Sequence, residues 1–253
     1  MYIAMTAIQH LIELVPQKSI RKRLGTLIGE MTLADRERES RRQLIFFGKL
    51  LHQQSFISAT DGNLSIRLND TAIMATPTGM SKGMMEPKDL VIVDLQGTKI
   101  KGKREVSSEI YMHLTIYGER PDVSAIVHAH PCTATGFASA GIALDEPLCS
   151  EIVMTLGEVP LAPYATTGSR ELSESLAPFI SKHNAILMAN HGAVSYGETL
   201  SEAYQRMEAL EHFARIVLVT QQLGRKKVLS GAEIEKLMTA RKRYVSNSRK
   251  RHY

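Results

Sequence analysis

Apolar residues recur along this chain with two periods, and each period predicts one kind of element. From about residue 35 to residue 56 the large apolar side chains return at helical spacing, which predicts a helix. After the turn at Asp61-Gly62, Leu64, Ile66 and Leu68 alternate with polar residues. This alternation predicts a half-buried strand.

The same patterns continue to the C-terminus as a mixture of strands and helices. Strands are expected at residues 73–75, 90–95, 123–130, 158–164, 185–189 and 193–196, and helices at 107–117, 132–140, 169–180, 199–224 and 230–244. The two kinds of element do not alternate regularly, as they would in a parallel sheet. We therefore expect an α/β fold, with one αβα layered domain around a largely antiparallel sheet.

The organisation along the chain predicts three segments. Residues 1–35 form an N-terminal extension, in which residues 6–14 have a helical pattern. Residues 36–245 form the main domain, and residues 246–253 form a basic C-terminal tail. The ordinary content of apolar residues, 43%, is enough for a sizeable core in a domain of this length.

Charge and cysteine content exclude several classes of function. The net charge of +5 is concentrated near the chain ends, but no nucleic-acid-binding motif accompanies it and there is no Trp, so no nucleic acid is expected as a partner. No apolar run approaches the roughly 20 residues of a membrane span, and no signal peptide is evident. The two cysteines, Cys132 and Cys149, form no CxxC pair, which favours a reducing, cytoplasmic location.

Candidate metal ligands stand in the segment Ala125-Ile-Val-His-Ala-His-Pro131. Side chains two apart on a strand share a face and lie roughly 7 Å apart, so His128 and His130 can converge on one ion. An isolated pair of this kind is more often a hydrogen-bonded polar edge. A third histidine, His191, also sits where an apolar strand meets a turn, and three histidines with an open position are a common catalytic zinc arrangement.

A carboxylate and several small polar loops add to this set. Glu109 follows Ser107-Ser108 at the expected start of a helix, where backbone N–H groups and hydroxyls suit a phosphate. His113 lies four residues on, so Glu109 and His113 could be a metal pair, although a local hydrogen bond is the commoner arrangement. Gly62-Asn63 and Thr76–Gly79 offer similar donors for an anion.

Taken in order, the motifs GNLS, TPTG, SSE, RPD…VHAHP, APYATTGS and NHG resemble the class II aldolase/adducin family, and within it the L-fuculose-1-phosphate aldolases. The resemblance covers about residues 41–244. It implies a nine-stranded type of antiparallel sheet flanked by helices, one Zn²⁺ per chain, and a homotetramer with active sites between subunits. It also implies a lyase that cleaves a phosphorylated ketose to dihydroxyacetone phosphate and an aldehyde.

The resemblance also assigns roles to residues. It implies zinc ligands at His128, His130, His191 and Glu109, catalytic proton transfer by Glu109 and Tyr244, and substrate phosphate binding by Asn63, Thr78, Gly79, Ser107 and Ser108. A second tyrosine of these aldolases has no counterpart here, because the chain reads Leu148-Cys-Ser-Glu-Ile152.

The same scaffold carries other activities, which remain alternatives. These are a sugar-phosphate dehydratase of the methylthioribulose-phosphate type and a sugar-acid-phosphate decarboxylase. Adducin-like members are interaction modules that lack the zinc histidines. The presence of all three histidines in this chain therefore favours an enzyme.

Overall fold

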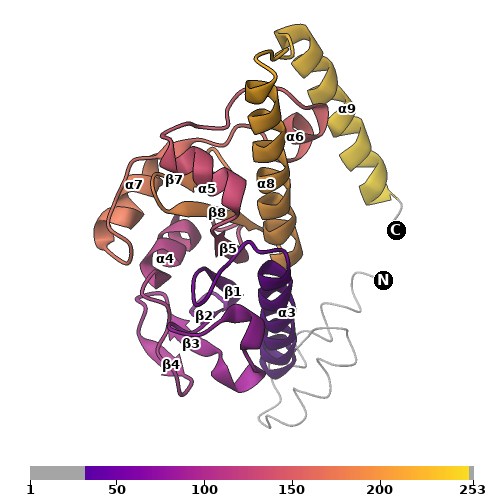
Figure 1. The fold of residues 1–253 in the computed structure, drawn as a ribbon. Coiled ribbons are helices and arrows are strands. Elements are labelled where there is room, and N and C mark those ends of the chain that lie inside the picture. The colour runs from indigo at the N-terminus through magenta and orange to yellow at the C-terminus, as the bar shows by residue number, and fades with distance from the viewer. Residues whose placement is uncertain (1–31, 251–253) are drawn as a thin grey trace, which may run out of the picture.

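One eight-stranded sheet organises the part of the chain that the computed structural model describes, which is residues 32–250, with side chains described to residue 240 (Figure 1). Its strands are β1 (Asn63–Asn69), β2 (Ala72–Ala75), β3 (Val91–Asp94), β4 (Lys99–Lys101), β5 (Ala125–Ala129), β6 (Leu161–Ala162), β7 (Ala185–Met188) and β8 (Gly192–Gly197). They follow the order β4-β3-β2-β1-β5-β8-β7-β6. All neighbours are antiparallel except β6 and β7, so the prediction of a largely antiparallel sheet is confirmed.

Helices cover both faces of the sheet and make the three predicted layers. They are α3 (Leu33–Gln53), α4 (Ile110–Glu119), α5 (Cys132–Ser139), α6 (Ser150–Thr155), α7 (Arg170–Ile180), α8 (Leu200–Gln222) and α9 (Gly231–Lys250), with two 3-10 turns, η1 (Lys82–Met84) and η2 (Pro87–Asp89). One apolar core joins α3, α5 and α8 to the sheet, and a second core joins α4 and α7 to the opposite face. Figure 1 shows these two helical layers on either side of the strands.

The alternation of side chains along β1 and β5 decides which residues face α4. Leu64 and Ile66 of β1 lie in the core of α3 and α8, as does Val127 of β5. Successive residues of a strand point to opposite faces, so the residues between them face the α4 layer. In register, Asn63 stands opposite His128. The central strands therefore present both polar side chains to the helix that carries Glu109.

Several details of the fold differ from the sequence prediction. The sheet has eight strands in the described residues, not the nine-stranded type, and the expected strand at 158–164 is reduced to the two residues of β6. Helix α4 begins at Ile110, so Ser107 and Ser108 precede it. Residues 148–152, where the second tyrosine of the aldolases has no counterpart, lead into a short helix, α6, which was not predicted.

The expected helix at residues 6–14 lies outside the described residues. Within the described part of the chain, no helix is both long and apolar enough to cross a membrane. Two of the predicted helices begin with a side-chain cap: the Thr199 hydroxyl accepts the backbone N–H of Glu202 at 3.1 Å, and the Ser230 hydroxyl accepts that of Glu233 at 3.3 Å.

Candidate metal centre

Three histidines from two places in the sequence converge at one end of the central strands. His128 belongs to β5, His130 follows that strand, and His191 lies in the turn between β7 and β8. Their ring centroids are 4.7–5.1 Å apart. One ring nitrogen of each lies within 4.8 Å of the others, so the three can hold a single metal ion, as the sequence predicted.

The turn that carries His191 depends on two backbone features. Asn190 has a positive φ of 57°, a conformation that Asn tolerates better than most residues. Gly192 leaves room for the neighbouring imidazole, because a Cβ there would lie 2.4 Å from His130 Cδ2 and 2.8 Å from the Ala129 carbonyl oxygen. The turn Asn190-His-Gly192 therefore lets His191 and His130 lie side by side.

The hydrogen bonds of His128 leave one ring nitrogen for a metal. Its Nδ1 lies 2.9 Å from the Ala193 carbonyl oxygen, which can only accept, so Nδ1 carries the proton. Nε2 is then the ligand atom, and it lies 3.1 Å from Nε2 of His130. Burial and the charges of the other two histidines lower the pKa of His130 to about 3, which keeps its ring neutral, as a metal ligand must be.

The carboxylate of Glu109 completes the cluster. Its Oε2 lies 3.2 Å from His128 Nε2 and its Oε1 lies 3.1 Å from His191 Nε2. Burial alone would raise the pKa of Glu109, but the adjacent imidazoles hold it well below its usual range. Burial likewise opposes the charge on His128, yet the Glu109 carboxylate raises the pKa of His128 overall. Glu109 is therefore ionised, and its two oxygens face His128 and His191.

The donor set fits a divalent metal by its geometry and also because two of its buried polar atoms lack a hydrogen-bond partner in the described part of the chain. Glu109 Oε1 and His191 Nδ1 are buried and make no hydrogen bond within the described residues. Such orphaned atoms are costly unless another partner is present. A cation between the imidazole nitrogens and the carboxylate would supply that partner on the Glu109 side. Three nitrogens and one carboxylate oxygen are a donor set that suits transition metals.

The predicted phosphate loops lie beside Glu109. Thr78 N–H donates to the Glu105 carbonyl at 3.0 Å, and Pro77 pairs with Val106, so the TPTG loop runs along the segment that leads to Ser107. The Ser107 hydroxyl accepts the Glu109 backbone N–H at 3.3 Å. Gly79 has a φ of 64° and open space around it. Phosphate binding by Thr78, Gly79, Ser107 and Ser108 remains a prediction.

The fifth predicted phosphate residue, Asn63, has a different set of partners. Its Nδ2 donates to Glu109 Oε2 at 2.8 Å, and its Oδ1 lies 2.5 Å from His113 Nε2. The expectation of a direct Glu109–His113 hydrogen bond is therefore wrong, because the Asn63 amide stands between the two side chains. An amide nitrogen has two hydrogens, so Asn63 can still offer one to a substrate.

Two further polar residues near the site, Lys82 and Asp61, were not among the site residues predicted from the sequence. Lys82 is 2% exposed, and its Nζ donates to the carbonyl oxygens of Thr60 at 2.5 Å and Met80 at 2.9 Å. Asp61 Oδ2 lies 3.7 Å from His130 Nδ1. A lysine in the apolar segment GMSKGMM was the available signal for the first. The side chain of the predicted catalytic Tyr244, in α9, lies outside the described residues.

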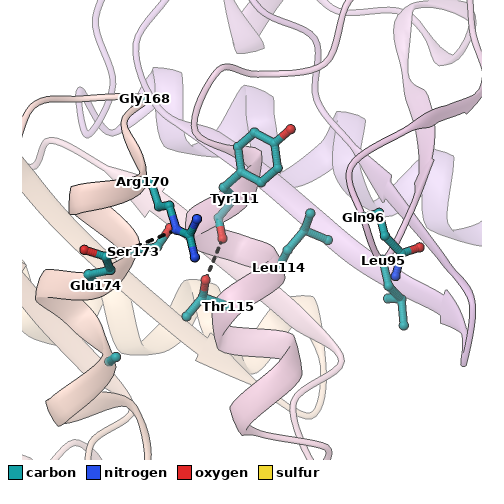
Figure 2. Close-up of a pocket in the computed structure, with 10 residues that line it drawn as sticks. Leu95, Gln96, Tyr111, Leu114, Thr115, Gly168, Arg170, Ser173 and Glu174 are labelled. Carbon is teal, nitrogen blue, oxygen red and sulfur yellow. Dashed lines mark hydrogen bonds and ion pairs between the residues drawn. The ribbon is translucent and has the colours of Figure 1, made fainter.

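A separate groove of about 910 Å³ lies on the outer side of α4. Figure 2 shows Tyr111, Leu114 and Thr115 of α4 on one side of it and Arg170 and Glu174 of α7 on another, with Leu95 and Gln96 at the turn after β3. The three histidines, Glu109 and the predicted phosphate residues are absent from its lining. The groove is thus distinct from the histidine cluster.

Comparisons with known proteins show the family to which the chain is similar. A model of the family described as Class II Aldolase and Adducin N-terminal domain matches residues 42–218. The chain is 35% identical to a 3-oxo-tetronate 4-phosphate decarboxylase of Pectobacterium atrosepticum over 196 residues, which cover 76% of this chain and 88% of that protein.

Two aldolases show similar likeness. A 5-deoxy-D-ribulose 1-phosphate aldolase of Bacillus thuringiensis is 33% identical over 201 residues, covering 79% of this chain and 93% of its own. The solved structure of an L-fuculose 1-phosphate aldolase superposes with a TM-score of 0.76 at 32% identity, covering 81% of this chain and 96% of that one.

Proposed function

Since the chain belongs to the class II aldolase and adducin family, we propose that it is a zinc-dependent aldolase that reversibly cleaves a phosphorylated ketose to dihydroxyacetone phosphate and an aldehyde. That it is an enzyme of the lyase class follows from its relatives. The observation that carries the finer proposal is the convergence of His128, His130 and His191 on the ionised carboxylate of Glu109.

The chain's own residues account for the proton transfers of such a reaction. In the direction of synthesis, Glu109 takes a proton from the hydroxymethyl carbon of dihydroxyacetone phosphate, and the resulting enediolate forms the new carbon–carbon bond with the aldehyde, whose oxygen receives a proton from Tyr244. In cleavage, Glu109 returns a proton to that carbon. When bound, the metal supplies a Lewis acid that stabilises negative charge on the substrate oxygens. The loops of Thr78, Ser107 and Ser108 hold the phosphate and so fix the orientation of the substrate.

Three finer points belong to the same proposal. The metal is zinc, because three imidazoles that leave a fourth position open are a common catalytic zinc arrangement. The enzyme is a homotetramer, a state implied by its resemblance to the aldolases, and Tyr244 takes part in proton transfer. It works in the cytoplasm, where its two unpaired cysteines, Cys132 and Cys149, would stay reduced.

A second candidate function is favoured by the relative from Pectobacterium atrosepticum. Loss of carbon dioxide from 3-oxo-tetronate 4-phosphate leaves the enediolate of dihydroxyacetone phosphate. An aldolase reaches the same enediolate by losing an aldehyde. In both reactions Glu109 would protonate the enediolate and the phosphate loops would hold the substrate. The reactions differ in the group that leaves.

The test offers both kinds of substrate to the zinc-loaded enzyme. A ketose 1-phosphate and 3-oxo-tetronate 4-phosphate are supplied separately, and released dihydroxyacetone phosphate is measured by coupled reduction while aldehyde and carbon dioxide are measured directly. We expect dihydroxyacetone phosphate and aldehyde in equal amounts from the ketose. Release only from the keto acid, together with carbon dioxide, would replace the aldolase proposal by the decarboxylase. Release from neither would reject both.

A further inference from the structure

A buried polar stripe on α4 faces a second polar stripe on β1. Glu109, His113 and Tyr117 are four residues apart and so share one face of the helix. Asn63 and Ser65 are two apart and share the face of the strand that is turned toward α4. Four of these residues are at most 3% exposed, and Glu109 has an 11% exposed side chain. A set of five polar side chains in this position needs an internal network of partners.

The network runs in one direction. Tyr117 Oη lies 2.8 Å from Ser65 Oγ, which lies 2.7 Å from His113 Nδ1. His113 Nε2 lies 2.5 Å from Asn63 Oδ1, and Asn63 Nδ2 lies 2.8 Å from Glu109 Oε2. A carboxylate and an amide oxygen only accept, so Asn63 donates to Glu109 and His113 Nε2 donates to Asn63. His113 Nδ1 then accepts from Ser65, and Ser65 accepts from Tyr117.

We propose that His113 is a positioning residue, which together with Ser65 and Tyr117 fixes the Asn63 amide so that its N–H group orients the carboxylate of Glu109 toward the three histidines. An amide can turn over and exchange its oxygen and nitrogen. If the Asn63 side chain turned so that its oxygen pointed toward Glu109, that oxygen would repel the carboxylate. The N–H of His113 opposes that turn, because it requires an acceptor at the position of Asn63 Oδ1.

The chemistry of His113 supports this role. Burial, with the charge of His128, lowers the pKa of His113 to about 3, so the ring is neutral at ordinary pH and has one donor and one acceptor. The Ser65 hydroxyl uses the acceptor, which leaves the donor at Nε2 for Asn63. His113 makes no hydrogen bond to Glu109, so the hydrogen-bonded connection between the two side chains runs through Asn63.

Two substitutions at one position test the inference. His113→Phe keeps a similar ring but has neither donor nor acceptor, whereas His113→Gln can still supply both. The inference rests on the proposed role of Glu109, so the first readout needs no substrate: it is the visible spectrum of bound Co²⁺, a probe that reports which atoms surround the metal. We expect His113→Phe to shift the Co²⁺ spectrum in the direction of Glu109→Gln, and His113→Gln to retain the parent spectrum.

The second readout is exchange of hydrogen between dihydroxyacetone phosphate and deuterated water. Partners of this kind typically contribute about 10–100-fold to metal affinity or activity, so we expect His113→Phe to lose that much at an unchanged KM. His113→Gln should recover most of the rate. If His113→Phe keeps both the parent spectrum and the parent rate, the inference is wrong. If the parent itself shows no exchange, the proposed function fails, and the Co²⁺ spectrum still decides the inference.

A second pair of variants removes single hydroxyl groups, so the inference can still be tested if His113→Phe does not fold. Tyr117→Phe deletes the first donor of the network. Tyr196→Phe is the matched control, because it deletes a buried tyrosine hydroxyl that donates to the His183 carbonyl at 2.6 Å, outside the network. We expect slower exchange in Tyr117→Phe than in Tyr196→Phe. In a Glu109→Gln background Tyr117→Phe should cause no further loss, since coupled residues are not additive. Equal rates in the two tyrosine variants, or full additivity, would overturn the inference.

Discussion

The Glu109 side chain stands at the N-cap of α4, where a polar side chain ordinarily accepts a backbone N–H of the helix. It makes no such capping bond. Its two oxygens face His128 and His191 instead, and the bond from Asn63 holds one of them. A residue kept only for helix stability would have the opposite arrangement. The geometry of this one side chain is therefore what favours proton transfer over capping.

Glu109→Gln separates these two roles. Glutamine has the same size and can still form hydrogen bonds, but it cannot take a proton at neutral pH. We expect a folded protein that retains zinc and exchanges the hydroxymethyl hydrogen of dihydroxyacetone phosphate at least about 100-fold more slowly, the scale of a general acid or base. Proton NMR in deuterated water measures the rate. An unchanged rate would move the base to another residue.

Gly192 offers a second test at the scale of one residue, because it makes room for His130. A Cβ in Gly192→Ala would displace the imidazole, which lies 2.4 Å from that position. We expect zinc affinity to fall by about 10-fold or more, as for disturbed ligand orientation in other metal sites. Gly118→Ala is the control, since a Cβ there meets no atom within 4 Å. Equal affinities in the two variants, measured by competition with a chelating dye, would show that His130 is not a ligand.

At the scale of elements, the sequence predicted which side chains share a face of one strand or helix, but it did not predict which elements pack against each other. The HxH motif on a strand and the turn at His191 predicted the histidine cluster, because strand alternation and strand ends are local properties. The pairing of α4 with β1 was not predictable in this way: Asn63 and His113 are 50 residues apart, and periodicity does not say which strand a helix face meets. The wrong expectation of a Glu109–His113 bond arose because the sequence does not show that Asn63 of β1 lies between these two residues.

Elements without a strong local pattern were missed or overextended. Strand β4 has three exposed residues and no apolar alternation, and α6 has only six residues. The expected strand at 158–164 is short because Val159 pairs with Leu144 instead of with the sheet. By contrast, the long helices α3 and α8 were predicted to within a few residues, because their apolar repeats extend over several turns.

The role of the turn η1 can be tested directly, because its residue Lys82 is hydrogen-bonded to two loops. Its ammonium group holds the carbonyl of Thr60, near Asn63, and that of Met80, next to Gly79. Hydrogen bonds to charged groups contribute about 1.5–3 kcal/mol, so Lys82→Met should lower the free energy of unfolding by that order.

Hydrogen exchange shows whether the loss in Lys82→Met is local. We expect faster amide exchange at residues 60–63 and 78–80 and a higher KM for a phosphorylated substrate. Lys88→Met is the control, because Lys88 is exposed and pairs with Glu86 at the surface. Unchanged exchange in both loops of Lys82→Met would show that Lys82 does not hold them together.

At the scale of the whole molecule, the fold brings distant segments to one end of the sheet. β1, β5 and β8 are adjacent although they are far apart in sequence, and α4 covers the face on which the metal ligands lie. The family resemblance implies active sites between subunits, so the proposed assembly matters for function. Sedimentation should give four times the chain mass of 28.1 kDa, and a monomer with full activity would contradict a shared site.

We propose that His128, His130, His191 and Glu109 form a metal centre that moves a proton on dihydroxyacetone phosphate. The most direct measurement is hydrogen exchange into that compound from deuterated water, by one preparation before chelation, after chelation and after return of zinc. With about one zinc per chain, as a catalytic site of this kind holds, we expect exchange that disappears with the metal and returns with it. Full exchange in protein shown to be free of metal, or in a His128→Ala/His130→Ala variant, would contradict it.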